Sequence, residues 1–314
     1  MQTIAFVVFD GFSSMALAAQ PVFEAANSIL GEEKYHAAVF SEHGGLVSSS
    51  GGLSIMTAPL EDNKFDTVII AGGTTAFEDA SEGLIRFVRS SFESSRRVAS
   101  ICTGAFVLAQ AGLLDGRRVT THWACARSLK ERFPTVILDE DRIFVKDDKV
   151  WTSAGMTAGI DLALAMVEED HGPDVARRVA QALVMYHRRA GGQSQHSALL
   201  DMGAKSDRIQ TALTYARANL SRALTVEDLA EVARLSPRQF SRAFKAETGH
   251  SPAKAVENLR LEAARLMMEQ SRHSIDEIAG QTGFLDRRRM REAFLRGFGQ
   301  PPQVIRRNAR QGAI

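Results

Sequence analysis

The sequence predicts two domains: an α/β domain whose largely parallel sheet is sandwiched by helices, followed by an all-α domain. Three observations support this division. The chain has 314 residues, which exceeds the usual size of one compact domain. Short β-branched runs alternate with helical stretches over residues 1 to about 190, as in parallel sheets covered by helices. In the last hundred or so residues, a helical unit is instead repeated after 49 positions.

Charge separates the two parts of the chain. Hydrophobic residues make up 45% and charged residues 24%, which is typical of a globular protein with a sizeable core. The net charge is only +1, but residues 1–207 hold 19 Lys+Arg against 26 Asp+Glu, whereas residues 208–314 hold 19 against 11. The second part therefore carries +8 and the first −7, which predicts a polyanionic partner for the second part: nucleic acid or an anionic membrane.

Nothing in the sequence indicates export or a metal centre. No run of 18 apolar residues occurs, and the chain enters the strand-like residues 3–9 without a basic leader, so we expect a cytoplasmic protein. Cys102 and Cys125 are the only cysteines, too few for a disulfide framework. The histidines show no metal-ligand spacing with them, so we expect neither a metal nor a cofactor.

In the first domain, ligand-binding residues are expected where strands end. The clearest strands are residues 4–9, 35–41, 66–71 and 97–101. In open α/β sheets ligands collect at the carboxyl ends of the strands. Two sharp strand exits mark that edge here, one at Gly72 and Gly73 and the other at Cys102 and Thr103.

The exit at Cys102 resembles a nucleophile elbow, because a strand turns at once into a helix and Gly104 permits close backbone approach. The free N–H groups and the helix dipole would there favour a thiolate and could hold an anionic or carbonyl oxygen. The same local residues fit a buried small side chain equally well, and we expect that role for Cys125. His122 ends a predicted strand and could approach the same pocket, although a structural role is the commoner fate of a lone histidine.

The second domain begins its repeat with two helix starts. Thr225 and Ser274 are predicted N-caps, each followed three residues later by an acid, Asp228 or Glu277, as in a capping box. Each short helix leads to a tight turn and then to a second helix. The turns are residues 233–235 and 282–285, the second helices start at Ser236-Pro237 and Asp286, and Gly249 and Gly299 end them. The pattern predicts two helix-turn-helix units, at about 225–249 and 274–299.

Matching apolar pairs fix which face of each second helix is buried. Phe240 and Phe244 lie four residues apart, as do Met290 and Phe294. A long amphipathic helix is predicted from Ser251-Pro252 to about residue 270, and it would hold the two recognition helices about one DNA turn apart.

The opposite face of each second helix is basic and polar. Its residues are Arg238, Gln239, Ser241, Arg242 and Lys245 in the first unit, and Arg287, Arg288, Arg289 and Arg291 in the second. Arginine can bond guanine O6 and N7 together, whereas lysine more often holds phosphate. One such charge run is equally typical of a solvated helix face, but its repetition within matched units favours double-stranded DNA. A membrane-surface helix would need a broad exposed apolar face, which these helices lack.

Residues 208–310 resemble the DNA-binding domain of the AraC/XylS family, including its Phe-Lys-x-x-x-Gly-x-Ser-Pro stretch at residues 244–252. The resemblance implies the following base readers: Arg238, Ser241 and Arg242 in the first unit, and Arg287, Arg288 and Arg291 in the second. Glu292 occupies the place that matches Arg242, where a carboxylate could accept from cytosine or repel a phosphate.

Residues 3–188 resemble the class I glutamine amidotransferase-like fold, in the form fused to AraC-type domains in GlxA-type regulators. The resemblance rests on the strand exits, on residues 118–123 and on residues 152–161. Relatives with this fold include amidotransferases, peptidases, hydratases and non-enzymatic sensors. Thr103 stands where the peptidase-like relatives have histidine, and residues 11–20 lack the acid of the hydratase-like relatives. We therefore expect no catalysis.

The resulting hypothesis is a homodimeric transcriptional regulator with a sensor domain (1–188), a polar, glycine-rich linker (189–207) and a DNA-binding domain (208–310). A small effector would bind near Gly72, Gly73, Cys102, Thr103 and His122. The resemblance implies a nitrogen-containing metabolite as effector, such as an amino acid, amide or betaine. Two alternatives remain: an enzyme acting on an amide or isonitrile through Cys102, and a redox sensor that uses Cys102.

Overall fold

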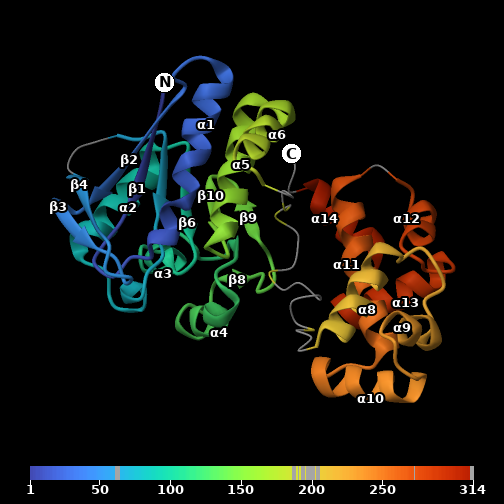
Figure 1. Cartoon of the computed structure of the whole chain (residues 1–314). Coiled ribbons are helices and arrows are strands. Elements are labelled where there is room, and N and C mark those ends of the chain that lie inside the picture. The colour runs from blue at the N-terminus through green and yellow to red at the C-terminus, as the bar shows by residue number, and fades with distance from the viewer. Residues whose placement is uncertain are drawn as a thin grey trace. The chain divides into compact units, whose positions relative to one another are not determined.

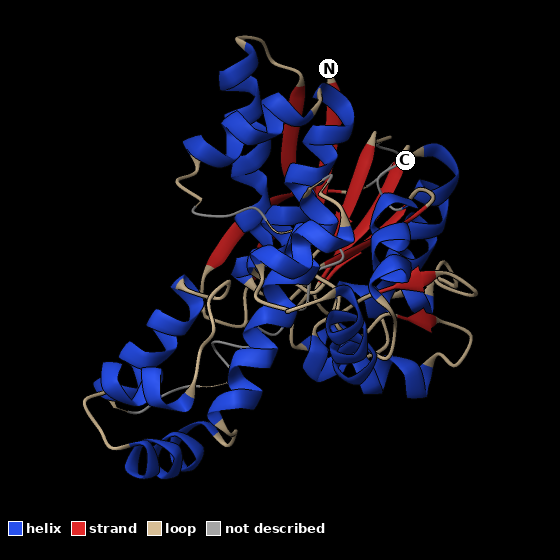
Figure 2. Ribbon diagram, turned by 90° about the vertical axis from the view of Figure 1, so that its right-hand side faces the viewer, coloured by secondary structure: helices blue, strands red, loops and turns tan. Residues whose placement is uncertain are grey.

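The computed structural model divides the chain into two compact units, Met1–Gln195 and His196–Ile314. It describes residues 1–60, 64–185, 189, 191, 195, 202, 206–271 and 273–311. Among these residues the strands belong to the first unit, and the second unit is helical (Figures 1 and 2). Within the described part of the chain, no helix is both long and apolar enough to span a membrane.

The first unit is built on an eight-stranded sheet with the order β3-β4-β2-β1-β5-β6-β10-β9. Its strands are β1 Gln2–Val7, β2 Tyr35–Ser41, β3 His43–Ser48, β4 Ser54–Pro59, β5 Thr67–Ile70, β6 Arg97–Ile101, β9 Phe144–Asp147 and β10 Val150–Ser153. All neighbouring pairs from β4 to β10 are parallel, and only the outer strands β3 and β9 run antiparallel to their neighbours. A separate parallel pair joins β7 Arg118–Val119 to β8 Ile137–Leu138. The predicted largely parallel sheet is confirmed.

Helices cover both faces of this sheet (Figure 1). They are α1 Gln20–Leu30, α2 Glu82–Ser94, α3 Gly104–Gln110, α4 Trp123–Arg132, α5 Thr157–His171 and α6 Pro173–Ala182, with two 3₁₀ turns, η1 Ser14–Ala19 and η2 Thr75–Phe77. Because side chains alternate along a strand, Ile4 and Phe6 of β1 pack with α1, α5 and α6, whereas Ala5 and Val7 pack with α2, α3 and α4. The sheet is thus the middle of three layers, as predicted.

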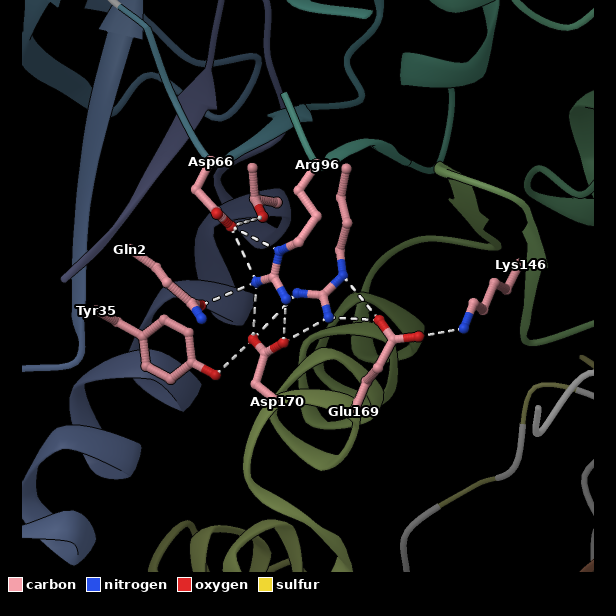
Figure 3. Close-up of polar contacts among 9 residues, drawn as sticks. Gln2, Tyr35, Asp66, Arg96, Lys146, Glu169 and Asp170 are labelled. Atoms are coloured by element: carbon pink, nitrogen blue, oxygen red, sulfur yellow. Dashed lines mark hydrogen bonds and ion pairs between the residues drawn. The ribbon is translucent and has the colours of Figure 1, made fainter. Parts of the chain in front are cut away.

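A buried ion-pair cluster joins the amino ends of the strands (Figure 3). Asp170, near the end of α5, is 1% exposed and accepts from Arg97 Nη2 at 2.6 Å, Arg96 Nη1 at 2.5 Å and Tyr35 Oη at 2.8 Å. Arg97 also pairs with Glu169. Further contacts reach Gln2, Asp66 and Lys146. The cluster holds α5 to β1, β2 and β6 at the edge of the sheet opposite Cys102.

The second unit contains two small cores that share one long helix. Its helices are α8 Asp207–Ala218, α9 Val226–Val232, α10 Pro237–Thr248, α11 Pro252–Gln270, α12 Ile275–Gln281, α13 Arg287–Phe298 and α14 Pro302–Gln311. Phe240 and Phe244 lie in the first core, and Met290 and Phe294 lie in the second. The long helix α11 supplies Leu259 to the first core and other side chains to the second. The predicted pair of units and the predicted helix between them are confirmed.

Local hydrogen bonds explain where these short helices begin. The predicted capping boxes at Thr225 and Ser274 are both present. Ser236 forms a third capping box with Gln239, which had not been predicted. At the other end of the helices, Gly249 and Gly299 adopt left-handed conformations that end α10 and α13, as expected.

Candidate functional site

In the first helix-turn-helix unit, α10 presents a basic face. Burial of Phe240 and Phe244 turns Arg238, Arg242 and Lys245 outward, and all three are exposed. The predicted reader Ser241 is half-buried. Gln239 is exposed, but its side-chain oxygen accepts from the Ser236 hydroxyl at 2.9 Å, so it also serves the helix cap.

In the second unit, α13 presents four exposed arginines. They are Arg287, Arg288, Arg289 and Arg291. Arg289 Nε lies 3.8 Å from a carboxylate oxygen of Asp286, whereas no ion pair of the other three occurs among the described residues. Arg238 and Arg242 of α10 likewise form no ion pair there. Uncompensated guanidinium groups on the outer face of a short helix are suited to phosphate and base-edge contacts.

In the first unit of the chain, the backbone around Cys102 forms a sharp elbow. Cys102 adopts φ +57°, a left-handed conformation that is rare for non-glycine residues. Its N–H donates to the carbonyl of Ser153 on β10 at 3.0 Å. A Cβ at Gly104 would lie 2.4 Å from the carbonyl oxygen of Ile70, so only glycine fits there. The predicted strand-elbow-helix is therefore present.

Four of the five predicted ligand-binding residues lie together at this elbow. The Thr103 hydroxyl donates to the Gly73 carbonyl and accepts from the Gly73 N–H, both at 2.8 Å. A Cβ at Gly72 would lie 2.8 Å from the Cβ of Cys102. Gly72, Gly73, Cys102 and Thr103 thus bring the carboxyl ends of β5 and β6 into contact.

Of the two roles that the sequence left open for Cys102, its surroundings favour the buried small side chain over the thiolate. Burial raises the pKa of its thiol from 9.0 to about 11, and hydrogen bonding with Thr103 offsets only part of that rise. The local sequence indicated a helix start at Cys102, but not the distant residues that bury the Cys102 side chain. Burial also raises the pKa of Cys125. At neutral pH the structure therefore favours a thiol at Cys102, not a thiolate.

Two residues that cover the elbow were missed because they are distant in sequence. Thr121 Oγ1 donates to the Cys102 carbonyl at 2.9 Å. Gly155 has φ +99°, and a Cβ there would lie 2.2 Å from the Cβ of Cys102. The sequence signals were the two segments that carry the family resemblance, residues 118–123 and 152–161, which contain Thr121 and Gly155. The elbow tolerates no larger side chain at this position.

His122 caps a helix. It is the N-cap residue of α4, and its Nδ1 accepts from the N–H of Ala124 at 3.3 Å. Its ring also lies 5.5 Å, centroid to centroid, from that of Trp123. In this segment it is the neighbouring Thr121 that contacts the Cys102 backbone.

Three residues of the predicted linker belong to the first unit and contact its other elements. Arg189 Nε donates to the fully buried carboxylate of Asp161 on α5 at 2.8 Å. Gly191 lies against Phe144, where a Cβ would come within 2.6 Å of the backbone oxygen. Gln195, the last residue of the first unit, is held at several points. Most of the other linker residues lie outside the described residues.

The side chain of Gln195 binds the segment next to the elbow. Its amide nitrogen lies 2.8 Å from the Thr121 carbonyl, 2.9 Å from that of Glu140 and 3.0 Å from that of Arg142. Its amide oxygen accepts from the Trp123 N–H at 2.9 Å. Thr121 therefore contacts both Gln195 and the elbow backbone.

A cavity of about 400 Å³ is lined by residues of the segments 8–10, 41–47 and 75–84 and contains none of the five predicted ligand-binding residues. Its wall includes the carboxylates of Asp10, Glu42, Glu78 and Asp79. The hydroxyl of Thr75, another wall residue, donates to the Asp10 carbonyl at 2.5 Å. The described residues contain no cluster of three side chains able to hold a metal ion.

An α/β domain with this elbow, joined to paired helix-turn-helix units, defines a class of transcriptional regulator. The DJ-1/PfpI family model matches residues 2–169, and a helix-turn-helix domain model matches residues 229–308. The chain belongs to the GlxA-type regulators, in which a DJ-1/PfpI domain precedes an AraC-type helix-turn-helix domain.

Similarity to curated regulators extends over nearly the whole chain. GlxA of Rhizobium meliloti is 34% identical over 98% of this chain and 97% of its own length. GbdR of Pseudomonas aeruginosa is 31% identical over 99% of this chain and 84% of its own length. Both are HTH-type transcriptional regulators.

Similarity to an enzyme and to solved structures is confined to part of the chain. An isonitrile hydratase of Pseudomonas putida is 41% identical, but over 42% of this chain and 58% of its own length. An AraC family regulator structure from Pseudomonas putida matches 58% of this chain and 100% of its own, with a TM-score of 0.51 and 22% identity. Drosophila melanogaster DJ-1beta matches 59% of this chain and 99% of its own, with a TM-score of 0.51 and 24% identity. These structures support the fold of the first unit alone.

Proposed function

We propose that this regulator binds two adjacent major-groove sites on one DNA duplex through α10 and α13. One observation carries the proposal: two matched, capped helices each expose arginines on the face opposite their buried side chains. The buried pair is Phe240 and Phe244 in α10, and Met290 and Phe294 in α13. Arg238, Ser241 and Arg242 would contact the bases of one half-site, and Arg287, Arg288 and Arg291 those of the other. Gln239, Lys245 and Arg289 would hold phosphates or sugars.

Selection from a random DNA pool tests this proposal on the full-length chain. The expected result is an enriched sequence with two conserved blocks about one helical turn, roughly 10 base pairs, apart. Arg238→Ala should relax one block and Arg288→Ala the other, because each removes a different base reader. Arg217→Ala is the matched control, since Arg217 is exposed on α8 and belongs to neither recognition helix. Blocks that survive both recognition-helix variants would contradict the placement.

The first unit acts as a sensor of a small nitrogen-containing metabolite. The elbow at Cys102 lies at the carboxyl edge of the sheet, where ligands bind in such folds. A relative that shares this domain is named for an isonitrile, a nitrogen compound. If the effector also reaches the cavity lined by Asp10, Glu42, Glu78 and Asp79, these acidic residues would favour a cationic form, such as an amine or a trimethylammonium group. These features support the class of effector but not its identity.

Coupling to DNA runs through Gln195. A ligand that displaces Thr121 moves the Thr121 carbonyl, to which the Gln195 side chain donates. The position of Gln195, the last residue of the first unit, then changes as well. Regulation requires that the effector bind two arrangements of the chain with different affinity. In this proposal the arrangements are Gln195 bound and Gln195 released.

Two measurements test the sensor. Thermal shift compares the binding of an amino acid, a primary amide and a trimethylammonium compound, and operator titration with and without the best binder then measures its effect on DNA affinity. Gln195→Ala should retain effector binding but reduce the effector's influence on operator affinity, because it breaks the contact with Thr121. Gln181→Ala, on the exposed face of α6, is the control and should respond as the wild type does. Equal responses of all three proteins would contradict this coupling.

Cys102 serves the pocket and not catalysis in this proposal, and the protein acts in the cytoplasm as a homodimer on paired half-sites. Apart from burial, the groups that shift the pKa of the Cys102 thiol are Thr103 and Cys125, and neither is an ordinary general base. Turnover of an amide or isonitrile that disappears in Cys102→Ala would overturn the non-enzymatic assignment. Peroxide-dependent operator affinity that disappears in Cys102→Ser would instead establish the redox alternative.

A further inference from the structure

The two helix-turn-helix units differ by one residue at the turn. Before the recognition helices, corresponding residues of the two units are 49 positions apart, as in Thr225 and Ser274 or Arg234 and Gly283. Within the recognition helices they are 50 positions apart, as in the buried Phe244 and Phe294. The second unit therefore contains an additional residue between its turn and its recognition helix.

Hydrogen bonds identify the additional residue as Leu285. In the first unit the N–H of Leu235 donates to the Ala230 carbonyl at 3.0 Å, and in the second the N–H of Phe284 donates to the Ala279 carbonyl at 2.9 Å. Leu235 is followed directly by the N-cap of α10, but Leu285 separates Phe284 from the N-cap of α13. Leu285 has no counterpart in the first unit.

Leu285 is an exposed apolar side chain on a fixed piece of backbone. It is 79% exposed, whereas the preceding Phe284 is 8% exposed and packs in the second core. On its other side, the Asp286 side chain caps α13 by accepting from the Arg289 N–H at 2.8 Å. The turn is further constrained because a Cβ at Gly283 would overlap the Leu220 carbonyl oxygen. Single exposed leucines are common on proteins, so position and not exposure carries the argument.

We propose that Leu285 is a specificity residue that packs against the 5-methyl group of a thymine in the half-site of the second unit. The amino-terminal residues of a recognition helix approach base edges most closely, and Leu285 directly precedes the N-cap of α13. Its neighbours Arg287 and Arg288 carry the charge that brings this end of the helix to DNA. The thymine methyl is the apolar group that the major groove displays, and apolar side chains recognise it. The inference rests on the proposed DNA contacts of α13.

Replacement of thymine by deoxyuridine tests the inference, because it removes the methyl group and keeps the hydrogen-bonding edge. Full-length wild type is titrated with operators in which each thymine of the half-site affected by Arg288→Ala is replaced in turn. One replacement should weaken binding about fourfold, the effect of one buried methyl-sized group. Leu285→Ala should bind that operator and its thymine parent equally, within about twofold.

Two control variants separate this inference from the function on which it rests. Leu295→Ala removes another exposed leucine, ten residues further along and near the far end of α13, and should keep the thymine preference. Arg288→Ala should weaken binding to both operators and leave their ratio unchanged. If wild type prefers the operator but no thymine responds to deoxyuridine, or if Leu285→Ala retains the response, Leu285 does not read a methyl group. If wild type shows no sequence preference at all, the proposed DNA contacts fail first.

Discussion

Asp170→Asn should destabilise the first unit strongly while leaving the helices of the second unit intact. The carboxylate contacts Arg96, Arg97 and Tyr35, and Arg97 is only 3% exposed. An uncharged amide leaves the buried guanidinium of Arg97 with Glu169 as its remaining acidic partner. Removing one member of a buried ion pair costs roughly 3–5 kcal/mol, and the retained Glu169 contact places the expected loss near the lower limit, about 3 kcal/mol.

The same contact predicts how stability depends on pH. Burial alone would raise the pKa of Asp170, but hydrogen bonds from Arg97 and Arg96 outweigh it and lower the pKa from 3.8 to about 2. Because the folded-state pKa is depressed, the stabilisation is complete above pH 5 and is lost as pH falls towards 2. The difference corresponds to about 2.5 kcal/mol, of which about half is lost by pH 3.

Urea unfolding monitored by tryptophan fluorescence measures both effects in the full-length chain. Both tryptophans, Trp123 and Trp151, lie in the first unit, and Arg97 stands 5.3 Å from the Trp151 ring centroid. The control is Asp174→Asn, because that side chain is 90% exposed and pairs only across the surface of α6; it should cost less than about 0.5 kcal/mol. Equal effects of the two variants, or an Asp170→Asn effect that does not shrink between pH 7 and pH 3, would refute the reasoning.

Three other predictions concern the elbow and the cap of α9 in the second unit. Alkylation of Cys102 in a Cys125→Ser background should accelerate about tenfold per pH unit from pH 7 to 9, because burial raises its pKa to about 11; a plateau below pH 8 would indicate a thiolate. Gly155→Ala should cost at least about 2 kcal/mol of first-unit stability, because its Cβ would overlap Cys102. The control is Gly31→Ala: Gly31 also has a positive φ, but a Cβ there would meet nothing within 4 Å, so this variant should cost about 1 kcal/mol. Equal costs for the Gly155 and Gly31 variants would exclude the overlap with Cys102. Thr225→Ala should cost about 1 kcal/mol of second-unit stability through its cap, measured by helical circular dichroism during urea unfolding; an unchanged midpoint would show that the cap is dispensable.

Features encoded by neighbouring residues were predictable from the sequence. Caps, turns and helix ends in the second unit follow from residues three or four positions apart, such as Ser274 with Glu277 and Phe240 with Phe244. The elbow was predictable for the same reason, since Cys102 and Gly104 mark an abrupt strand exit.

Features created by distant residues were not predictable in the same way. The thiol pKa depends on burial, and residues such as Gly155, from another strand end, help to cover Cys102. Gln195 lies in a polar segment that reads as a linker, yet its side chain bonds to carbonyls more than fifty residues earlier. The turns predicted from the sequence, residues 233–235 and 282–285, already differ in length by one residue, but the backbone hydrogen bonds of the turns are needed to identify Leu285 as the additional one.

Operator titration at physiological salt tests most directly the central claim, that α10 and α13 both bind one DNA duplex. It compares wild type with Arg238→Ala, Arg288→Ala and Arg217→Ala. Two recognition helices on one duplex predict that each of the first two variants loses about 10- to 100-fold in affinity for the selected operator, while Arg217→Ala binds as wild type does. Binding that is indifferent to sequence, or that is unaffected by both recognition-helix variants, would contradict the claim.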